Sequence, residues 1–117
     1  MTKLRNYHFV VSAYNTLPIL MSKPAMVIVN SDPDFMPGSH WMAIYIDSYG
    51  FCYFFDSFGR KPYGNILNFI RRNSLMWGYN HEQIQDIASD HCGRYCLLFL
   101  LNYVLGNSVD EFISMFN

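Results

Sequence analysis

The sequence has few cysteines, little net charge and no long apolar run, and each scarcity argues against a class of protein. Its 117 residues include three cysteines, an odd and sparse set that predicts no disulfide framework and indicates a reducing compartment. The net charge of −1 argues against a nucleic-acid partner. The longest apolar run, residues 96–105, contains Asn102 and is too short to span a bilayer. With no evident secretory signal, we expect an intracellular protein of the cytoplasm or nucleus without membrane contact.

Several motif classes are missing as well. The chain contains no glycine-rich phosphate loop, no internal repeat and no low-complexity segment. Residue types that bind zinc occur at His40, His91, Cys92 and Cys96, but they form neither a Cys-x-x-Cys nor a His-x-x-x-His pair. We therefore expect neither a metal nor another cofactor.

Apolar and aromatic residues are abundant, at 51% and 18% of the chain, and they predict a folded core. A chain of this length forms one domain, residues 1–117, and buries about two-thirds of its unfolded surface. Patterning predicts strands at 25–29, 41–46 and 51–55, an ambiguous strand at 8–12, connecting chain at 76–79, a short strand around 83–85, and helices at 65–73, 92–104 and 109–116.

The segment from Gln85 to Cys96 is the most informative, because a polar stretch leads directly into an apolar helix. Asp90 is the predicted N-cap, which places Cys92 in the first turn. Free N–H groups and the positive end of the helix dipole favour the thiolate there. Gly93 has no side chain, so a substrate carbonyl can approach N–H groups that form an oxyanion hole.

A predicted hairpin brings a histidine and an aspartate together. His40 precedes the first strand of this hairpin and Asp56 follows the second. If Ile46 pairs with Gly50, His40 lies directly opposite Asp56. If the register shifts by one residue, Asp56 falls opposite Trp41 and a bulge must re-aim it. The sequence does not choose between these registers, and either one places the histidine near the aspartate.

Nucleophilic cysteine chemistry needs a thiol of lowered pKa, a base, a group that orients the base, and oxyanion donors. The chain offers each in a suitable setting. Cys92 is the candidate nucleophile, His40 the base and Asp56 the orienting group. The Gln85 side-chain amide assists the backbone N–H groups near the cysteine as oxyanion donors.

Read separately, each candidate also has an ordinary structural role, because free cysteines usually pack in cores and aspartates often end strands. Cys96, one helical turn into the apolar run, and Cys52, in an aromatic strand, are expected to pack. His91 is a rival base, but adjacent residues on a helix point away from one another, so we favour His40.

Four separated motifs, taken in chain order, carry a family resemblance. They are the segments 38–41 (Gly-Ser-His-Trp) and 53–59 (Tyr-Phe-Phe-Asp-Ser-Phe-Gly), then Gln85, and seven positions later Cys92-Gly93. Together they resemble the adenain and ubiquitin-like-protein protease superfamily of cysteine peptidases.

Two features resemble the adenovirus-type and Polinton or Maverick transposon proteases in particular. These are the spacing from Gln85 to Cys92 and the segment 27–33 followed by Pro37-Gly38. Asp56 is instead the form common in the ubiquitin-like branch, since adenovirus proteases carry a glutamate.

The resemblance implies an α+β fold, with a small mixed β-sheet packed against a central helix that carries the cysteine at its N-terminus, and with flanking helices. It implies the following roles: Cys92 as nucleophile, His40 as base, Asp56 as orienting group, Gln85 and Gly93 in the oxyanion hole, and Trp41 as a shield for the histidine.

The function implied is that of a cysteine endopeptidase that processes viral or transposon structural proteins. Its partners would be a polypeptide substrate and, by the adenovirus example, a peptide activator. The chain is shorter at both ends than the usual family domain. That shortness leaves open an inactive remnant that acts as an interaction domain. A separate alternative concerns the substrate: a peptidase or isopeptidase specific for ubiquitin-like proteins.

Overall fold

The computed structural model describes residues 8–20, 23–31, 40–81, 92–104 and 114. Within these ranges the chain forms five strands and two helices of three residues or more. In chain order they are β1 (His8–Ala13), β2 (Ala25–Asn30), β3 (Trp41–Ile46), β4 (Phe51–Phe55), α1 (Gly64–Asn73), β5 (Met76–Tyr79) and α2 (Cys92–Val104).

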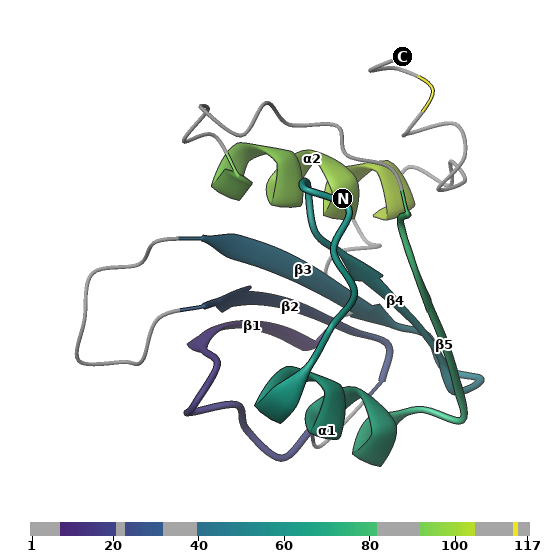
Figure 1. The fold of residues 1–117 in the computed structure, drawn as a ribbon. Coiled ribbons are helices and arrows are strands. Elements are labelled where there is room, and N and C mark those ends of the chain that lie inside the picture. The colour runs from purple at the N-terminus through teal and green to yellow at the C-terminus, as the bar shows by residue number, and fades with distance from the viewer. Residues whose placement is uncertain (1–7, 21–22, 32–39, 82–91, 105–113, 115–117) are drawn as a thin grey trace.

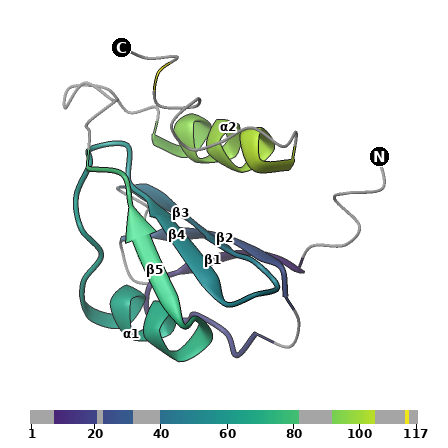
Figure 2. The same ribbon diagram turned by 90° about the vertical axis from the view of Figure 1, so that its right-hand side faces the viewer.

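The strands form one mixed sheet in the order β1-β2-β3-β4-β5. The three central strands pair antiparallel with one another, whereas each edge strand, β1 and β5, pairs in parallel with the strand beside it. Helix α1 covers one face of the sheet and α2 covers the other (Figures 1 and 2). The result is three layers with two cores.

The core beneath α1 is built from alternate residues of the central strands. Val27 and Val29 of β2, with neighbours from β3 and β4, pack against one face of the helix. That face consists of Ile66, Phe69 and Ile70, which follow the i, i+3, i+4 spacing of a helix.

The core beneath α2 uses the intervening residues of the same strands. Met26 and Ile28 of β2 face this side, together with Phe55 of β4. The ring of Phe99 from α2 stacks on Phe55 with centroids 4.7 Å apart. Every residue of β2 is buried because both of its faces are covered.

The structure confirms most of the predicted elements. Strands 41–46 and 51–55 and the helix 92–104 have the predicted bounds. The strand predicted at 25–29 extends to Asn30, and the helix predicted at 65–73 begins at Gly64. The ambiguous segment at 8–12 is a strand. The expectation that 76–79 is connecting chain is wrong. It is β5, and Trp77 and Tyr79 pack against the α1-side core with the period of two that marks a strand.

The predicted strand at 83–85 lies outside the described residues, and so does the predicted helix at 109–116, apart from Ser114. No helix in the described part of the chain has the length and hydropathy needed to cross a membrane.

Both predicted registers of the hairpin are wrong. Ile46 pairs with Cys52, and Ala43 with Phe55. The cause is Asp47, whose Oδ1 accepts hydrogen bonds from the backbone N–H groups of Tyr49 and Phe51, both at 2.9 Å. These bonds draw residue 51 opposite residue 47 and leave a three-residue loop that ends in a glycine of positive φ.

Candidate active site

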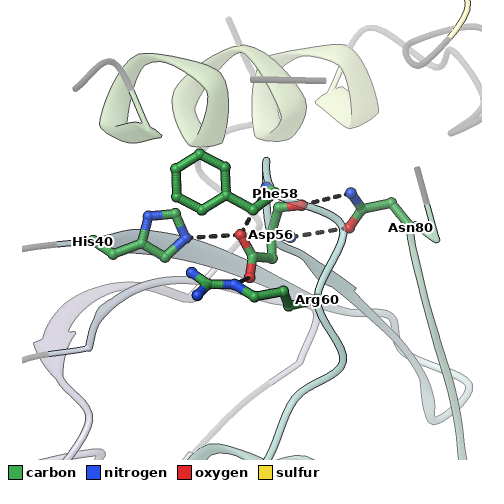
Figure 3. Close-up of polar contacts among 5 residues, drawn as sticks. All are labelled: His40, Asp56, Phe58, Arg60 and Asn80. Atoms are coloured by element: carbon green, nitrogen blue, oxygen red, sulfur yellow. Dashed lines mark hydrogen bonds and ion pairs between the residues drawn. The ribbon is translucent and has the colours of Figure 1, made fainter. Parts of the chain in front are cut away.

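His40 lies immediately before β3 at the end of the sheet, and 7% of its surface is exposed. Its carbonyl accepts a 2.9 Å hydrogen bond from the backbone N–H of Ser31, which ties it to the end of β2. Its Nε2 lies 2.7 Å from Oδ1 of Asp56, the first residue after β4 (Figure 3). The predicted pairing of this histidine with this aspartate is therefore present, although the two residues meet diagonally across the hairpin.

The Asp56 side chain is only 3% exposed, and each of its carboxylate oxygens has a partner. Besides His40, Oδ1 accepts a 2.9 Å bond from the N–H of Phe58, and Oδ2 accepts a 3.1 Å bond from Nε of Arg60. Burial by itself raises the pKa of this carboxyl. The hydrogen bonds from His40 and Phe58 and the charges of His40 and Arg60 outweigh burial, so the pKa lies below its ordinary value and the group is an anion at neutral pH.

The charge state of Asp56 fixes the imidazole tautomer. An ionised carboxylate can only accept hydrogen bonds, so Nε2 of His40 carries the proton in the 2.7 Å bond. In the neutral ring, Nδ1 is then the nitrogen with a free lone pair. The arrangement supplies a base whose accepting atom points away from its orienting carboxylate.

Three residues that contact this pair were not predicted from the sequence, and the first two are Phe58 and Arg60. Phe58 stacks on the His40 ring, with centroids 4.7 Å apart and planes 7° from parallel. Arg60 places its guanidinium 5.0 Å from the Phe58 ring centroid while it binds Asp56 (Figure 3). Both residues lie in the segment that follows the aspartate, at i+2 and i+4, and that closeness is the signal that could have identified them.

Asn80 is the third such residue, and no local signal marks it. Its side chain accepts a 2.9 Å bond from the backbone N–H of Asp56 and donates a 2.6 Å bond to the Asp56 carbonyl. Asn80 lies directly after β5 and is 1% exposed. Because β5 was not predicted, neither was this clamp on the backbone of the aspartate.

Helix α2 begins at Cys92, as predicted, and its first turn lies over the end of the sheet where β3 begins and β4 ends (Figure 1). The Cys92 and Gly93 side-chain environments, Gln85 and the rival base His91 lie outside what the structure describes. Their roles remain predictions.

The two other cysteines have packing environments. Cys52 is fully buried under α1. Burial, and to a smaller extent the negative charge of Asp47, raises the pKa of its thiol to about 12. Cys96 is fully buried in the core under α2. Trp41, the predicted shield of the histidine, is half-buried and packs on the α2 side of the sheet, while the ring stacked on His40 is Phe58.

A cavity of about 370 Å³ opens on the α1 side of this pair. His40, Asp56 and Arg60 form part of its wall, and the start of α1 forms another part. In the described part of the chain, no three His, Cys, Asp or Glu side chains cluster as metal ligands would.

Comparison with known proteins gives the class to which these features point. Relatives of this chain include proteins named as viral thiol and cysteine proteases, which confirms the resemblance to the adenain and ubiquitin-like-protein protease superfamily. No protein-family model matches the chain.

Among these relatives is a thiol protease of Acanthamoeba polyphaga mimivirus, 32% identical over 98 residues, an alignment that covers 74% of this chain and 32% of the relative. The cysteine protease of African swine fever virus (isolate Tick/Malawi/Lil 20-1/1983) is 27% identical over 99 residues, covering 74% of this chain and 36% of that protein. The chain thus spans about a third of the length of these relatives.

Solved structures share the fold. One crystal structure of the African swine fever virus protease superposes with a TM-score of 0.69 at 17% identity, covering 97% of this chain and 56% of that one. A selenomethionine crystal structure of the same protease gives a TM-score of 0.63 at 23% identity, over 77% of this chain and 38% of that one. These matches confirm the predicted α+β architecture.

Proposed function

We propose that this chain is the catalytic core of a cysteine endopeptidase that cleaves viral or transposon structural proteins. Cys92 is the nucleophile, His40 the general base, and Asp56 the group that orients the base. Gln85 and the N–H groups at Cys92 and Gly93 form the oxyanion hole. The observation that carries the proposal is the buried 2.7 Å bond from His40 to Asp56 at the end of the sheet over which the cysteine helix begins.

The reaction follows from the tautomer of His40. Nδ1 takes the thiol proton of Cys92, and the thiolate attacks the scissile carbonyl carbon. The tetrahedral oxyanion collapses to a thioester as the imidazolium returns its proton to the leaving amine. Water, deprotonated by the same nitrogen, then hydrolyses the thioester and regenerates the thiol. Throughout, the ionised Asp56 stabilises the imidazolium and holds its orientation.

The test is cleavage of a proteome-derived peptide library by the purified chain, followed by mass spectrometry. We expect Cys92→Ala to abolish cleavage because the acyl-enzyme can no longer form. Cys96→Ala is the matched control and should retain most of the cleavage, provided that the variant stays folded. The opposite ranking would mean that Cys92 is not the nucleophile.

A second candidate, a peptidase for ubiquitin-like proteins, is favoured by the name of one relative. The homologue from other African swine fever virus isolates is called a SUMO-1 cysteine protease. A SUMO-1 vinyl-sulfone probe separates the candidates, because only this one predicts labelling at Cys92. The third alternative, an inactive interaction domain, predicts that the Cys92 thiol reacts with iodoacetamide like an ordinary thiol of pKa about 8.5.

A further inference from the structure

The segment that follows β4 surrounds the histidine–aspartate pair with two further side chains. Within five residues, 56–60, the chain supplies the carboxylate, a ring that stacks on the imidazole and a guanidinium that reaches both. Figure 3 shows the four side chains as one closed group, with Asp56 between His40 and Arg60. Neither Phe58 nor Arg60 is needed for the chemical steps described above, so their arrangement requires a separate explanation.

Phe58 controls a rotation that the hydrogen bond leaves free. The bond to Asp56 fixes one atom of the imidazole, Nε2, but the terminal torsion of histidine has a broad energy minimum. A ring stacked nearly parallel, 7° from the imidazole plane, restricts that torsion. Because a proton must pass between Nδ1 and the thiol, the orientation of the plane decides whether the base can reach it.

Arg60 controls the carboxylate in a comparable way. Oδ1 binds His40, and the Arg60 Nε–H holds Oδ2 at 3.1 Å, so the carboxylate cannot turn without breaking one of two charge-assisted bonds. The Arg60 side chain is 60% exposed, on the wall of the cavity on the α1 side, whereas the carboxylate that it holds is buried. The guanidinium therefore provides positive charge without filling the core.

We propose that Phe58 and Arg60 are positioning residues for the predicted peptidase: Phe58 sets the plane of the His40 ring, and Arg60 fixes the Asp56 carboxylate against it. This inference rests on the proposed function. Lys61 is the other cationic side chain on the same cavity wall. A variant at that position would reveal whether its charge also acts on the histidine–aspartate pair.

The experiment measures the rate at which iodoacetamide alkylates Cys92 from pH 4 to 9, read by mass spectrometry on the peptide that contains Cys92. No substrate is required, and the rate reports the thiolate that the imidazole maintains. Thermal unfolding of every variant is measured alongside, so that a loss of reactivity in a folded protein can be recognised.

Phe58→Leu keeps a branched apolar side chain at this position and removes the stacked ring. We expect alkylation at pH 6 to slow by about threefold to tenfold, the range of an aromatic pair interaction. Phe58→Tyr keeps the ring and should stay within about twofold of the wild type. If leucine and tyrosine give the same rate, Phe58 does not position the histidine.

Arg60→Gln removes the charge next to Asp56. We expect the acid limb of the alkylation profile to move to higher pH by about half a unit, because the remaining carboxylate is more easily protonated. Arg60→Lys, which keeps the charge, should recover part of the shift. Arg71→Gln, which changes an exposed arginine in the last turn of α1, is the control and should leave the profile unchanged.

The outcomes separate this inference from the function on which it rests. A wild-type Cys92 that reacts as an ordinary thiol overturns the proposed function. A reactive Cys92 whose profile is unchanged in Phe58→Leu and Arg60→Gln, both folded, overturns the positioning roles and leaves the proposed function standing.

Discussion

At the residue scale, the ionised carboxylate of Asp56 links the stability of the protein to pH. Its pKa is lowered in the fold, so its contribution is present above the ordinary aspartate pKa of about 4 and is lost as pH falls through the lowered value. Asp56→Asn removes that contribution. We expect the variant to be less stable than the wild type at pH 6 and the difference to shrink towards pH 3, as measured by urea unfolding.

Other carboxyl groups also titrate in this range, so the difference between the two proteins is the informative quantity. Turnover of Asp56→Asn should fall while the protein remains folded. If the variant is unfolded at pH 6, Asp56 acts mainly as a structural residue that ends the strand, as its isolated sequence position would suggest.

Asn80 provides a second prediction at this scale. Asn80→Ala removes both bonds that the asparagine makes to the backbone of Asp56. The Asp56 carbonyl keeps its 2.7 Å bond from the Gly59 N–H, but the buried Asp56 N–H loses the Asn80 oxygen. We expect a loss of about 2–4 kcal/mol in the free energy of unfolding, because two buried bonds are lost and a buried N–H without its acceptor is costly. Asn73→Ala is the control. It removes a single bond, to the Phe69 carbonyl at the end of α1, and should cost about 1 kcal/mol.

If Asn80→Ala costs no more than Asn73→Ala, the clamp on Asp56 is not a principal stabilising contact. If it costs the expected amount but leaves Cys92 reactivity unchanged, the aspartate is held in place by its side-chain bonds alone.

At the element scale, the sequence predicts strands and helices well where apolar periodicity is long and less well where it is short. Strands β3 and β4 and helix α2 have the predicted bounds because each carries a buried face of several residues. Strand β5 has only four residues with a glycine among them, so its alternation was too brief to recognise. Asn80 was missed for the same reason, because its position depends on β5.

The candidate site shows the same division. His40 and Asp56 were predicted to meet because any register of the hairpin keeps its two ends close. The register itself depended on the side chain of Asp47, and its bonds to two backbone N–H groups are not visible as a periodic pattern. The stacking of Phe58 depends on a turn whose backbone path the sequence does not specify.

The turn of the hairpin gives a prediction for the glycine that closes it. Gly50 has φ of +95°, and a Cβ there would lie 3.0 Å from Cγ of Leu75. The leucine is 87% exposed and can move, so the backbone conformation is the main cost. We expect Gly50→Ala to lower the free energy of unfolding by about 1–2 kcal/mol, measured by urea denaturation.

Gly78 is the matched control because it lies in β5 without a positive φ, and a Cβ at this position would meet only the Phe51 ring, at 3.9 Å. Gly78→Ala should be neutral or slightly stabilising, by up to about 1 kcal/mol. Equal destabilisation in both variants would show that the turn does not require a glycine at residue 50.

At the scale of the whole molecule, the sheet separates two buried cores, and each contains one cysteine. Cys52 lies in the core under α1 and Cys96 in the core under α2, and both are fully buried. Cys92, at the start of α2, is the remaining thiol. The fold thus protects two thiols on opposite faces of the sheet, and the proposed function requires the third to be available.

The fold therefore predicts how many thiols react before and after unfolding. In the native protein at pH 7, a brief treatment with iodoacetamide should modify Cys92 and leave the other two cysteines intact. The raised pKa of Cys52 keeps that group in the thiol form, and burial keeps the reagent from Cys96. In 8 M urea, all three cysteines should be modified at similar rates, since burial no longer distinguishes them. Mass spectrometry of the digested protein gives each site separately. Rapid native modification of Cys52 or Cys96 would mean that the corresponding core opens on the timescale of labelling, and slow modification of Cys92 would support the interaction domain over the peptidase.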